Sequence, residues 1–259
     1  MEEHDTADDV LELAADSGQL ILENGGETYR VEETMITIGR AFGMAEVGSF
    51  ATPTGIIASV TGKDGRTAAQ VRRVKKRTIN IEVITQLNDL SHQLAEGIVD
   101  FKQMKAEVER IARLPIVRPL PALLWGGVSA GFFTLLFGGG VQDALVSFFI
   151  GCIIKLLMMA IPTQKVGGFF MNILGGGLAA LLAIISVHIG LGMNLDKIII
   201  GSIMLLVPGL IMVNAIRDTI AGDLVAGVSR GVEAIIVAVA ISIGTGIVLK
   251  IWFLLPGRI

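Results

Sequence analysis

One segment decides the fold of this chain, Val207-Pro-Gly-Leu-Ile-Met-Val-Asn-Ala-Ile-Arg-Asp-Thr-Ile-Ala-Gly-Asp-Leu-Val-Ala-Gly-Val-Ser-Arg230. A long apolar stretch precedes it and another follows it, yet the segment itself carries charged and polar side chains among glycines. A charge at the centre of a membrane helix costs about 2.5–3.5 kcal/mol on insertion scales, so it is kept there only with a partner, in a water-filled cavity or at the membrane edge. The function of the chain depends on which of these three applies.

Composition divides the chain into a mixed first half and an apolar second half. The 259 residues are 52% hydrophobic and carry a formal net charge of −3, with a mean hydropathy of +0.69. Charged residues are frequent up to about residue 118 and isolated after residue 120. This distribution predicts an α-helical integral membrane protein with an N-terminal cytoplasmic α+β domain.

The charge pattern gives no support for nucleic-acid binding. The basic run at residues 72–77 has no aromatic residues between its cations, whereas surfaces that bind nucleic acid commonly combine the two. The run is either a solvated strand edge or a face toward anionic lipid headgroups.

No residue pattern predicts a metal, a cofactor or an enzyme active site. Cys152 is the only cysteine, and the three histidines are scattered along the chain, which does not match the ligand spacing of a zinc site. A Walker A sequence is absent. We also find no nucleophile beside a general base, so we expect no catalytic residues, no metal and no cofactor.

Residues 1–114 are predicted to form the α+β domain. Apolar residues recur at helical spacing from residue 5 or 6 to 23, from 31 to 42, from 79 to 97 and from 100 to 114. Between the second and third of these helices, residues 47–60 and 67–74 are β-like and flank a strong turn signal at 61–65. The domain is therefore expected to place helices beside a hairpin or a small sheet.

A proline-rich linker at residues 115–121 leads into a transmembrane helical domain at 122–259. A helix needs about 20 residues to cross the hydrocarbon, and we predict five spans, at roughly 122–137, 142–161, 167–189, 195–213 and 228–254. Gly127 and Gly131 have the spacing that lets helices approach closely, within one protomer or between subunits. The large N-terminal domain and the positive residues predict a multi-pass protein of the cytoplasmic (plasma or inner) membrane with its N-terminus in the cytoplasm.

Pro208 falls inside the fourth predicted span, where it removes a helical hydrogen bond and frees a carbonyl. Gly209 beside it loosens the backbone further. Either this is a kinked packing helix, or it is a broken helix whose backbone lines a substrate cavity.

The polar residues in and after this segment share helix faces, and they are Asn214, Arg217, Asp218, Asp223, Arg230 and Glu233. They form either a charged cytoplasmic loop with local pairs, such as Arg230 with Glu233, or a water-accessible vestibule at the cytoplasmic end of spans four and five. We favour the vestibule. In it Arg217 and Arg230 attract a carboxylate through bidentate hydrogen bonds, and the acidic residues balance them or titrate with transported protons.

Five further residues are candidates for polar function. Lys155 lies in the second span, where it either snorkels to the interface or faces the path, and Asn172 in the third span adds polar lining. In the soluble domain the densest polar motif contains Glu27, Arg30 and Glu32. It is either a helix break with local charge pairs or a regulatory or gating surface.

Several separated motifs together resemble the threonine/serine exporter family over nearly the whole chain. They are Glu27-Thr28-Tyr29-Arg30-Val31-Glu32, Thr52-Pro53-Thr54-Gly55, Asn88-Asp89-Leu90, Val207-Pro208-Gly209, Asn214-Ala215-Ile216-Arg217-Asp218 and Gly222-Asp223. The resemblance implies a soluble N-terminal region joined to membrane spans, and export of small amino acids driven by the proton gradient. The second membrane block of the fused members is missing, so the chain resembles the larger half of the split, two-component type. That type has a smaller membrane protein as companion and is linked to succinate export.

These observations favour a secondary exporter, or an exporter subunit, in the lipid bilayer. Its expected substrate is a small carboxylate metabolite, threonine or serine first and a dicarboxylate such as succinate second. Its expected protein partners are a second small membrane subunit, further copies of itself, or both. The alternative from another class is a non-transporting assembly or regulatory membrane protein.

Overall fold

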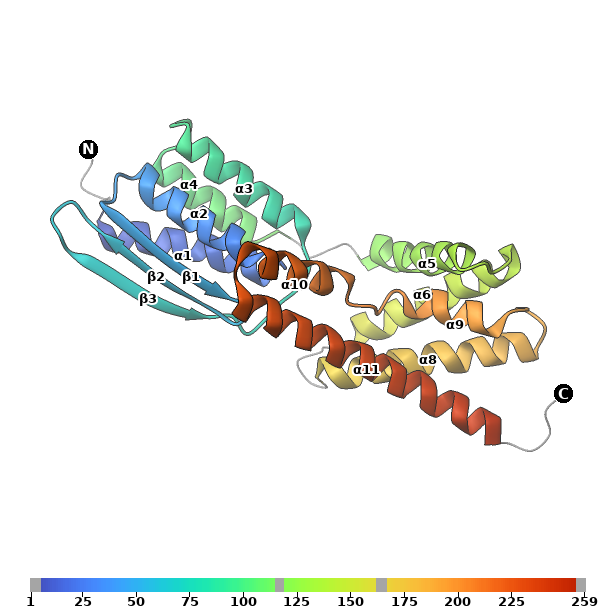
Figure 1. The fold of residues 1–259 in the computed structure, drawn as a ribbon. Coiled ribbons are helices and arrows are strands. Elements are labelled where there is room, and N and C mark those ends of the chain that lie inside the picture. The colour runs from blue at the N-terminus through green and yellow to red at the C-terminus, as the bar shows by residue number, and fades with distance from the viewer. Residues whose placement is uncertain (1–5, 115–118, 162–166, 255–259) are drawn as a thin grey trace. The chain divides into compact units, whose positions relative to one another are not determined.

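The computed structural model describes residues 6–114, 119–161 and 167–254 (Figure 1). The chain folds as two compact units. The first, which we call the N-terminal unit, comprises Met1–Ile116 together with Leu210–Val232. The second, the apolar unit, comprises Val117–Gly209 and Glu233–Ile259. The charged segment that interrupts the apolar half of the sequence therefore belongs mainly to the N-terminal unit.

The N-terminal unit contains four helices of its own and a three-stranded sheet. Its elements are α1 (Ala7–Glu23), α2 (Thr28–Ala41), β1 (Glu46–Thr52), β2 (Gly55–Thr61), β3 (Thr67–Arg73), α3 (Ile81–Ala95) and α4 (Phe101–Ala112). Two further helices complete the unit. They are α10 (Gly209–Ala221), of which only Gly209 lies outside the unit, and the first turns of α11 (Leu224–Leu254).

Local signals in the sequence set ends of α1, α3 and α4. The Thr6 side chain accepts from the backbone N–H of Asp9 at the start of α1, and Asp100 forms a capping box with Gln103 at the start of α4. Gly97, with φ of 74°, follows the end of α3. Such capping bonds satisfy backbone groups that the helix itself leaves without partners.

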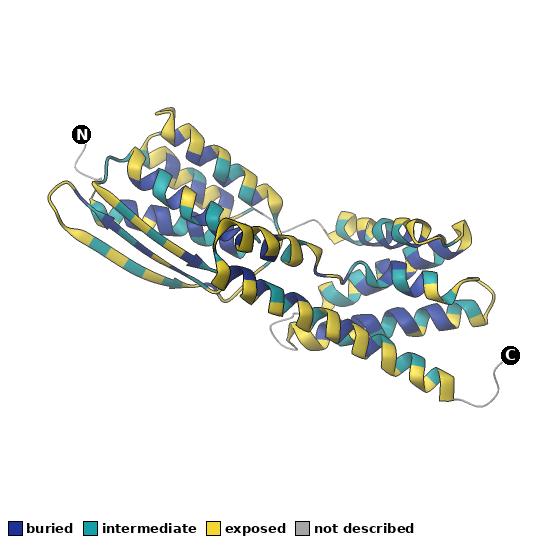
Figure 2. Ribbon diagram, viewed as in Figure 1, coloured by how far each residue is buried: buried dark blue, intermediate teal, exposed yellow. Residues whose placement is uncertain are grey.

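The predicted β region is an antiparallel sheet in the order β1-β2-β3. Residues 52 and 55 are paired across the first turn, and residues 61 and 67 across the second. Helices α1 and α2 lie against one face of this sheet, where Ala51, Ile56 and Val60 are buried (Figure 2). The N-terminal unit thus has the helices and small sheet that the sequence predicts.

The apolar unit is a bundle of helices held together by very close backbone contacts. It comprises α5 (Pro119–Leu136), α6 (Val141–Ala160), α8 (Gly168–His188), α9 (Leu195–Ile203) and the remainder of α11. A Cβ atom at Gly127 would lie 2.7 Å from the carbonyl oxygen of Phe148, which confirms that this glycine brings α5 and α6 together within one chain. A Cβ atom at Gly244 of α11 would lie only 2.0 Å from the carbonyl oxygen of Ile173 in α8.

The fourth predicted span, residues 195–213, is not one helix. Helix α9 ends at Ile203 after nine residues, and α10 begins only at Gly209. A nine-residue helix rises about 14 Å, about half of the hydrocarbon thickness. Pro208 stands in the break, because proline removes a helical hydrogen bond and disfavours helix in the residue before it.

Four helices of the described residues, not five, are long and apolar enough to cross a membrane, namely α5, α6, α8 and α11. Their bounds differ from the predicted spans by no more than four residues. Of the expected linker at 115–121, residues 115–118 lie outside the described ranges, while Pro119 and Pro121 belong to the first turn of α5, a position that proline tolerates.

Candidate functional site

The turn between α1 and α2 is held by side chains from the far end of the sequence. Gly25, with φ of 91°, turns the chain sharply. The Asn214 side chain donates to the carbonyl oxygen of Gly25 over 2.9 Å, and Arg230 Nη2 donates to that of Gly26 over 2.7 Å. Two consecutive carbonyls of the turn are thus bound by α10 and α11, and all of these residues belong to the N-terminal unit.

Asp218 caps helix α2. Its Oδ1 accepts from the backbone N–H of Thr28 over 3.2 Å and from the Thr28 hydroxyl over 2.7 Å. Glu27, which occupies the N-cap position, makes no capping bond with its own side chain. A carboxylate 190 residues away therefore takes over the usual work of an N-cap, and its negative charge also suits the positive end of the helix.

The same carboxylate forms a buried ion pair. Asp218 Oδ2 lies 3.0 Å from Arg230 Nε, and their side chains are 0% and 8% exposed. A buried charge needs such compensation, because removing one partner of a buried pair costs about 3–5 kcal/mol. Of the three ways to keep a charge beside apolar segments, the partner is therefore the one that applies to Asp218 and Arg230.

Glu27 lies between two arginines. Its carboxylate accepts from Arg30 Nε over 3.1 Å and from Arg217 Nη1. Burial raises the pKa of Glu27, but the hydrogen bonds from Arg217 and Arg30 lower it by more than burial raises it. The pKa of Glu27 therefore lies below its ordinary value. The arrangement carries one net positive charge, and the Arg217 side chain is 58% exposed.

A cavity of about 290 Å³ opens beside these arginines within the N-terminal unit. Polar groups from Arg30, Asn88 and Arg217 line one part of it, and Ile81, Ile84 and Leu210 are among its apolar residues. The Asn88 side-chain oxygen accepts from Arg30 over 3.2 Å, which leaves the amide N–H₂ to donate. A guanidinium with exposed N–H donors, beside apolar side chains that line a small cavity, can bind a small molecule that carries a carboxylate.

Glu32 and Asp223 form an acidic pair, because the charge of Asp223 acts on the Glu32 carboxyl. Glu32 accepts from the backbone N–H of Ala51 over 2.7 Å, and Asp223 Oδ2 lies 3.4 Å from Thr28 Oγ1. Burial raises the pKa of Glu32, the hydrogen bond from Ala51 offsets part of the rise, and the charge of Asp223 adds to it. A carboxyl with a raised pKa can take up a proton more readily than an exposed one.

Five other predicted residues belong to the apolar unit. Lys155 on α6 and Asn172 on α8 are half-buried, as is Glu233 on α11. Pro208 is buried in the break between α9 and α10. Gly209, the first residue of α10, is exposed and falls on the same side of the unit boundary.

Sequence reasoning missed several polar contacts. Thr28 and Asn88 stand in the quoted family motifs, but only the fold shows that they meet Asp218 and Arg30. In the apolar unit, Asp143 accepts from the backbone N–H groups of Met193 and Asn194 and from the Asn194 side chain. A glycine three residues before Asp143 was the one local signal for it, because this spacing is typical of a capped helix start.

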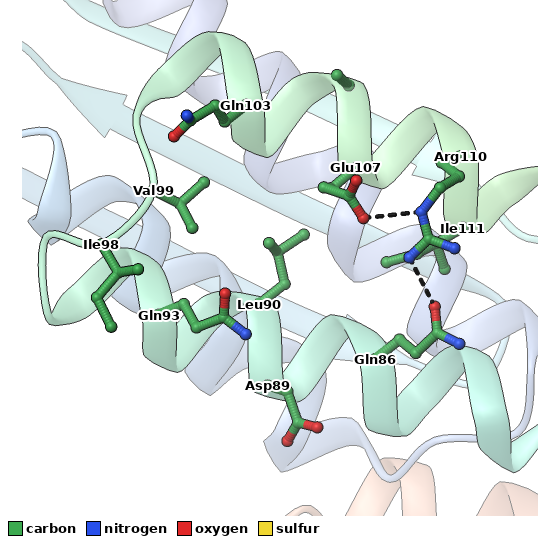
Figure 3. Close-up of a pocket in the computed structure, with 11 residues that line it drawn as sticks. Gln86, Asp89, Leu90, Gln93, Ile98, Val99, Gln103, Glu107, Arg110 and Ile111 are labelled. Atoms are coloured by element: carbon green, nitrogen blue, oxygen red, sulfur yellow. Dashed lines mark hydrogen bonds and ion pairs between the residues drawn. The ribbon is translucent and has the colours of Figure 1, made fainter.

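A larger groove lies between α3 and α4, with a volume of about 610 Å³ (Figure 3). Its cation, Arg110, is bound by Glu107 over 2.8 Å and by Gln86 over 3.0 Å. Asp89 adds a further negative charge to the lining. The groove is therefore acidic on balance and unsuited to a carboxylate. Nowhere in the described ranges do three His, Cys, Asp or Glu side chains gather as metal ligands would.

Four apolar helices joined to a polar α+β unit define a helical membrane protein. Within that class, the chain belongs to the threonine/serine exporter family. Residues 12–252 match this family, ThrE, which is described as "Putative threonine/serine exporter". The resemblance seen in the sequence motifs is thereby confirmed.

Curated relatives of the chain carry two kinds of name. The "Probable succinate transporter subunit YjjP" of Escherichia coli (strain K12) is 27% identical over 244 residues, which cover 94% of each chain. The protein of the same name in Klebsiella aerogenes is 26% identical, with the same coverage. The "Threonine/serine exporter" of Corynebacterium glutamicum is 24% identical over 95% of this chain but only 52% of its own length. No solved structure matches the chain.

Proposed function

We propose that the chain is the larger subunit of a secondary exporter that moves a small carboxylate metabolite out of the cell, and that it is not an enzyme. The observation that carries the proposal is the half-exposed Arg217 beside Glu27, Arg30 and a cavity of about 290 Å³. Family membership supports transport as the activity. The N-terminal unit would then lie in the cytoplasm, where it meets the substrate before export.

Two substrate classes fit this site, small amino acids and dicarboxylates. The relatives that match the chain over most of their own length favour a dicarboxylate. Threonine or serine is the first candidate from the family name. A dicarboxylate such as succinate gains support because the relatives matched over 94% of their length are named succinate transporter subunits. Two guanidinium groups also suit two carboxylates.

In the proposed capture step, Arg217 breaks its hydrogen bond to the Glu27 carboxylate and donates to a carboxylate of the substrate instead. Glu27 stays ionised because its pKa is low, so it holds both arginines in place until a carboxylate competes for one of them. Arg217 is the more exposed of the two arginines, 58% against 30% for Arg30, and can turn toward the ligand. The apolar residues Ile84 and Leu210 receive the short carbon chain.

Proton coupling is assigned to the acidic pair. Glu32 and Asp223 interact electrostatically, and the pKa of Glu32 is raised by burial and by Asp223. In the apolar unit the break at Pro208 and Gly209 supplies backbone carbonyls of the kind that transporters use at substrate paths. Lys155, Asn172 and Glu233 remain candidates for that path. A second small membrane subunit, further copies of the chain, or both would complete the path.

Efflux from loaded vesicles tests the proposal. Purified chain is reconstituted with and without its companion membrane protein, and release of labelled succinate and of labelled threonine is followed with and without a pH gradient. We expect release of one substrate, faster with a proton gradient. Release of neither substrate in any condition would instead favour the non-transporting assembly or regulatory protein.

A pair of arginine variants tests the site. Arg217→Ala removes charge-assisted hydrogen bonds worth about 1.5–3 kcal/mol, so the substrate concentration for half-maximal export should rise about 10- to 100-fold. Arg110→Ala, in the acidic groove between α3 and α4, is the matched control and should export normally. Unchanged export by Arg217→Ala would rule out the capture step while leaving transport itself intact.

A further inference from the structure

Helix α10 buries polar side chains and exposes apolar ones, the opposite of a surface helix on a water-soluble domain. Its polar residues Asn214 and Asp218 are buried inside the N-terminal unit, at 3% and 0% exposure. Its outward face carries the apolar residues Met212, Val213, Ile216 and Ile220, which are 45–81% exposed, together with the exposed Arg217 and Thr219. A surface helix in water turns its apolar stripe inward, and a contiguous exposed apolar patch marks a membrane or protein contact.

The apolar face continues onto the first turns of α11, still within the N-terminal unit. Leu224, Val225, Val228 and Val232 are each at least half exposed. Helix α11 is one of the four described helices apolar enough to cross a membrane, and it has 31 residues. About 20 residues suffice to cross, so about ten remain, which is the part that belongs to the N-terminal unit. The exposed face of α10 therefore adjoins a membrane-crossing helix.

Basic residues stand at the same end of the N-terminal unit. The backbone N–H groups of Thr78 and Asn80 donate to the carbonyl oxygens of Glu23 and Asn24 over 2.7 and 3.1 Å. These bonds tie the segment after β3 to the α1–α2 turn, to which Asn214 of α10 is also bonded. Lys75, Lys76 and Arg77 directly precede Thr78, and all three are exposed.

We propose that α10 is an interfacial helix that lies on an anionic lipid surface. Its apolar face enters the boundary between headgroups and acyl chains, and the cations at residues 75–77 contact anionic headgroups, each worth about 1 kcal/mol near the membrane surface. The polar face of the same helix holds the α1–α2 turn. The helix thus seats the N-terminal unit on the bilayer, and this assignment does not depend on the transported substrate.

Spin labels on the full chain test the depth of α10. In a Cys152→Ala background, labels are placed by Ile216→Cys and Ile220→Cys, and at the exposed Glu96 after α3 by Glu96→Cys as a matched control. The protein is reconstituted in vesicles of phosphatidylcholine and phosphatidylglycerol. Collision with oxygen, which concentrates in lipid, is compared with collision with a water-soluble nickel chelate.

We expect oxygen to dominate at positions 216 and 220 and the nickel chelate to dominate at position 96. Nickel access at all three positions would place α10 in water and overturn the proposal. Low access to both reagents at 216 and 220 would mean that protein covers the face, from a second copy or a companion subunit, and would overturn it equally.

The headgroup contact has its own test. With Lys75→Glu and Lys76→Glu combined, oxygen access of the label at position 220 should fall in the anionic vesicles and stay unchanged in phosphatidylcholine alone. Equal access for variant and parent in the anionic vesicles would contradict the role of the cations.

Discussion

Asp218 joins three helices through one carboxylate, because Oδ1 caps α2 at Thr28 while Oδ2 lies 3.0 Å from Arg230 Nε of α11. Asp218 itself stands on α10. Within the N-terminal unit, the start of α2, the last turn of α10 and the first turns of α11 are thus fixed to one another. A helix that continues into the apolar unit is thereby bound to the fold that carries the arginine cavity.

Replacing Asp218 should destabilise the N-terminal unit strongly. Asp218→Ala removes the carboxylate facing Arg230 and the cap of α2, for a loss of about 3–5 kcal/mol. Thermal unfolding of the purified protein in detergent would show it as a lower midpoint. The double variant Asp218→Leu with Arg230→Met should lose less, because an apolar pair replaces a charge pair. Equal losses in the single and double variants would show that the ion pair is not the cause.

Acid should weaken the contact between Glu27 and its arginines. The pKa of Glu27 in the folded chain is below its ordinary value, so its carboxylate stabilises the fold at neutral pH and this contribution is lost as the pH falls below about 4.5. We expect Glu27→Gln to be less stable at neutral pH and to lose less stability on acidification. Glu96→Gln, an exposed control, should follow the parent at every pH. Parallel pH profiles for Glu27→Gln and the parent would refute the assignment.

Gly244 should tolerate no side chain, whereas Gly246 on the same helix should accept one. A methyl group at Gly244 meets the backbone oxygen of Ile173 at 2.0 Å, and one at Gly246 meets nothing within 4 Å. Alanine favours a helix over glycine by about 1 kcal/mol, so Gly246→Ala should be neutral or stabilising. Overpacking costs about 1–3 kcal/mol or more, so Gly244→Ala should lower the unfolding midpoint. Similar midpoints for the two variants would mean that α8 and α11 are not packed this closely.

Asp143 should be essential to the apolar unit. Its two oxygens accept from the backbone N–H groups of Gly140, Met193 and Asn194 and from the side-chain amide of Asn194. Asp143→Asn keeps the size of the side chain but places its N–H₂ donor where N–H groups already point. We therefore expect a loss of about 3 kcal/mol or more in the free energy of unfolding. Gln142→Ala next to it removes one exposed bond to the Gly190 carbonyl and should cost less than about 1 kcal/mol. Equal unfolding midpoints would contradict this.

Local signals predicted much of the fold. The caps at Thr6 and Asp100, the glycine stop at Gly97 and the long apolar helices all follow from short-range rules about hydrogen bonding and periodicity. Pro208 also marked the break correctly. The sequence predicts one span over residues 195–213 because they are apolar apart from Asp196, Lys197 and Ser202, and composition alone does not register that the helix is interrupted.

The partners of the charged segment were beyond sequence reasoning. Asn214, Asp218 and Arg230 bind residues about 190–200 positions earlier in the chain. Spacing along a helix indicates which side chains share a face, but not which distant turn that face meets. A charged face next to apolar segments has the same sequence pattern whether water or a protein turn covers it, so the sequence alone leaves both interpretations open.

The bond between Thr28 and Asp218 sets an order on biosynthesis. During translation Thr28 is made before the helices α5, α6 and α8, and Asp218 is made after all three. The newly made N-terminal segment must therefore wait, with the first turn of α2 lacking its cap, while the translocation machinery inserts the hydrophobic helices. The amino-terminal fold is thus completed only after these three hydrophobic helices have been made.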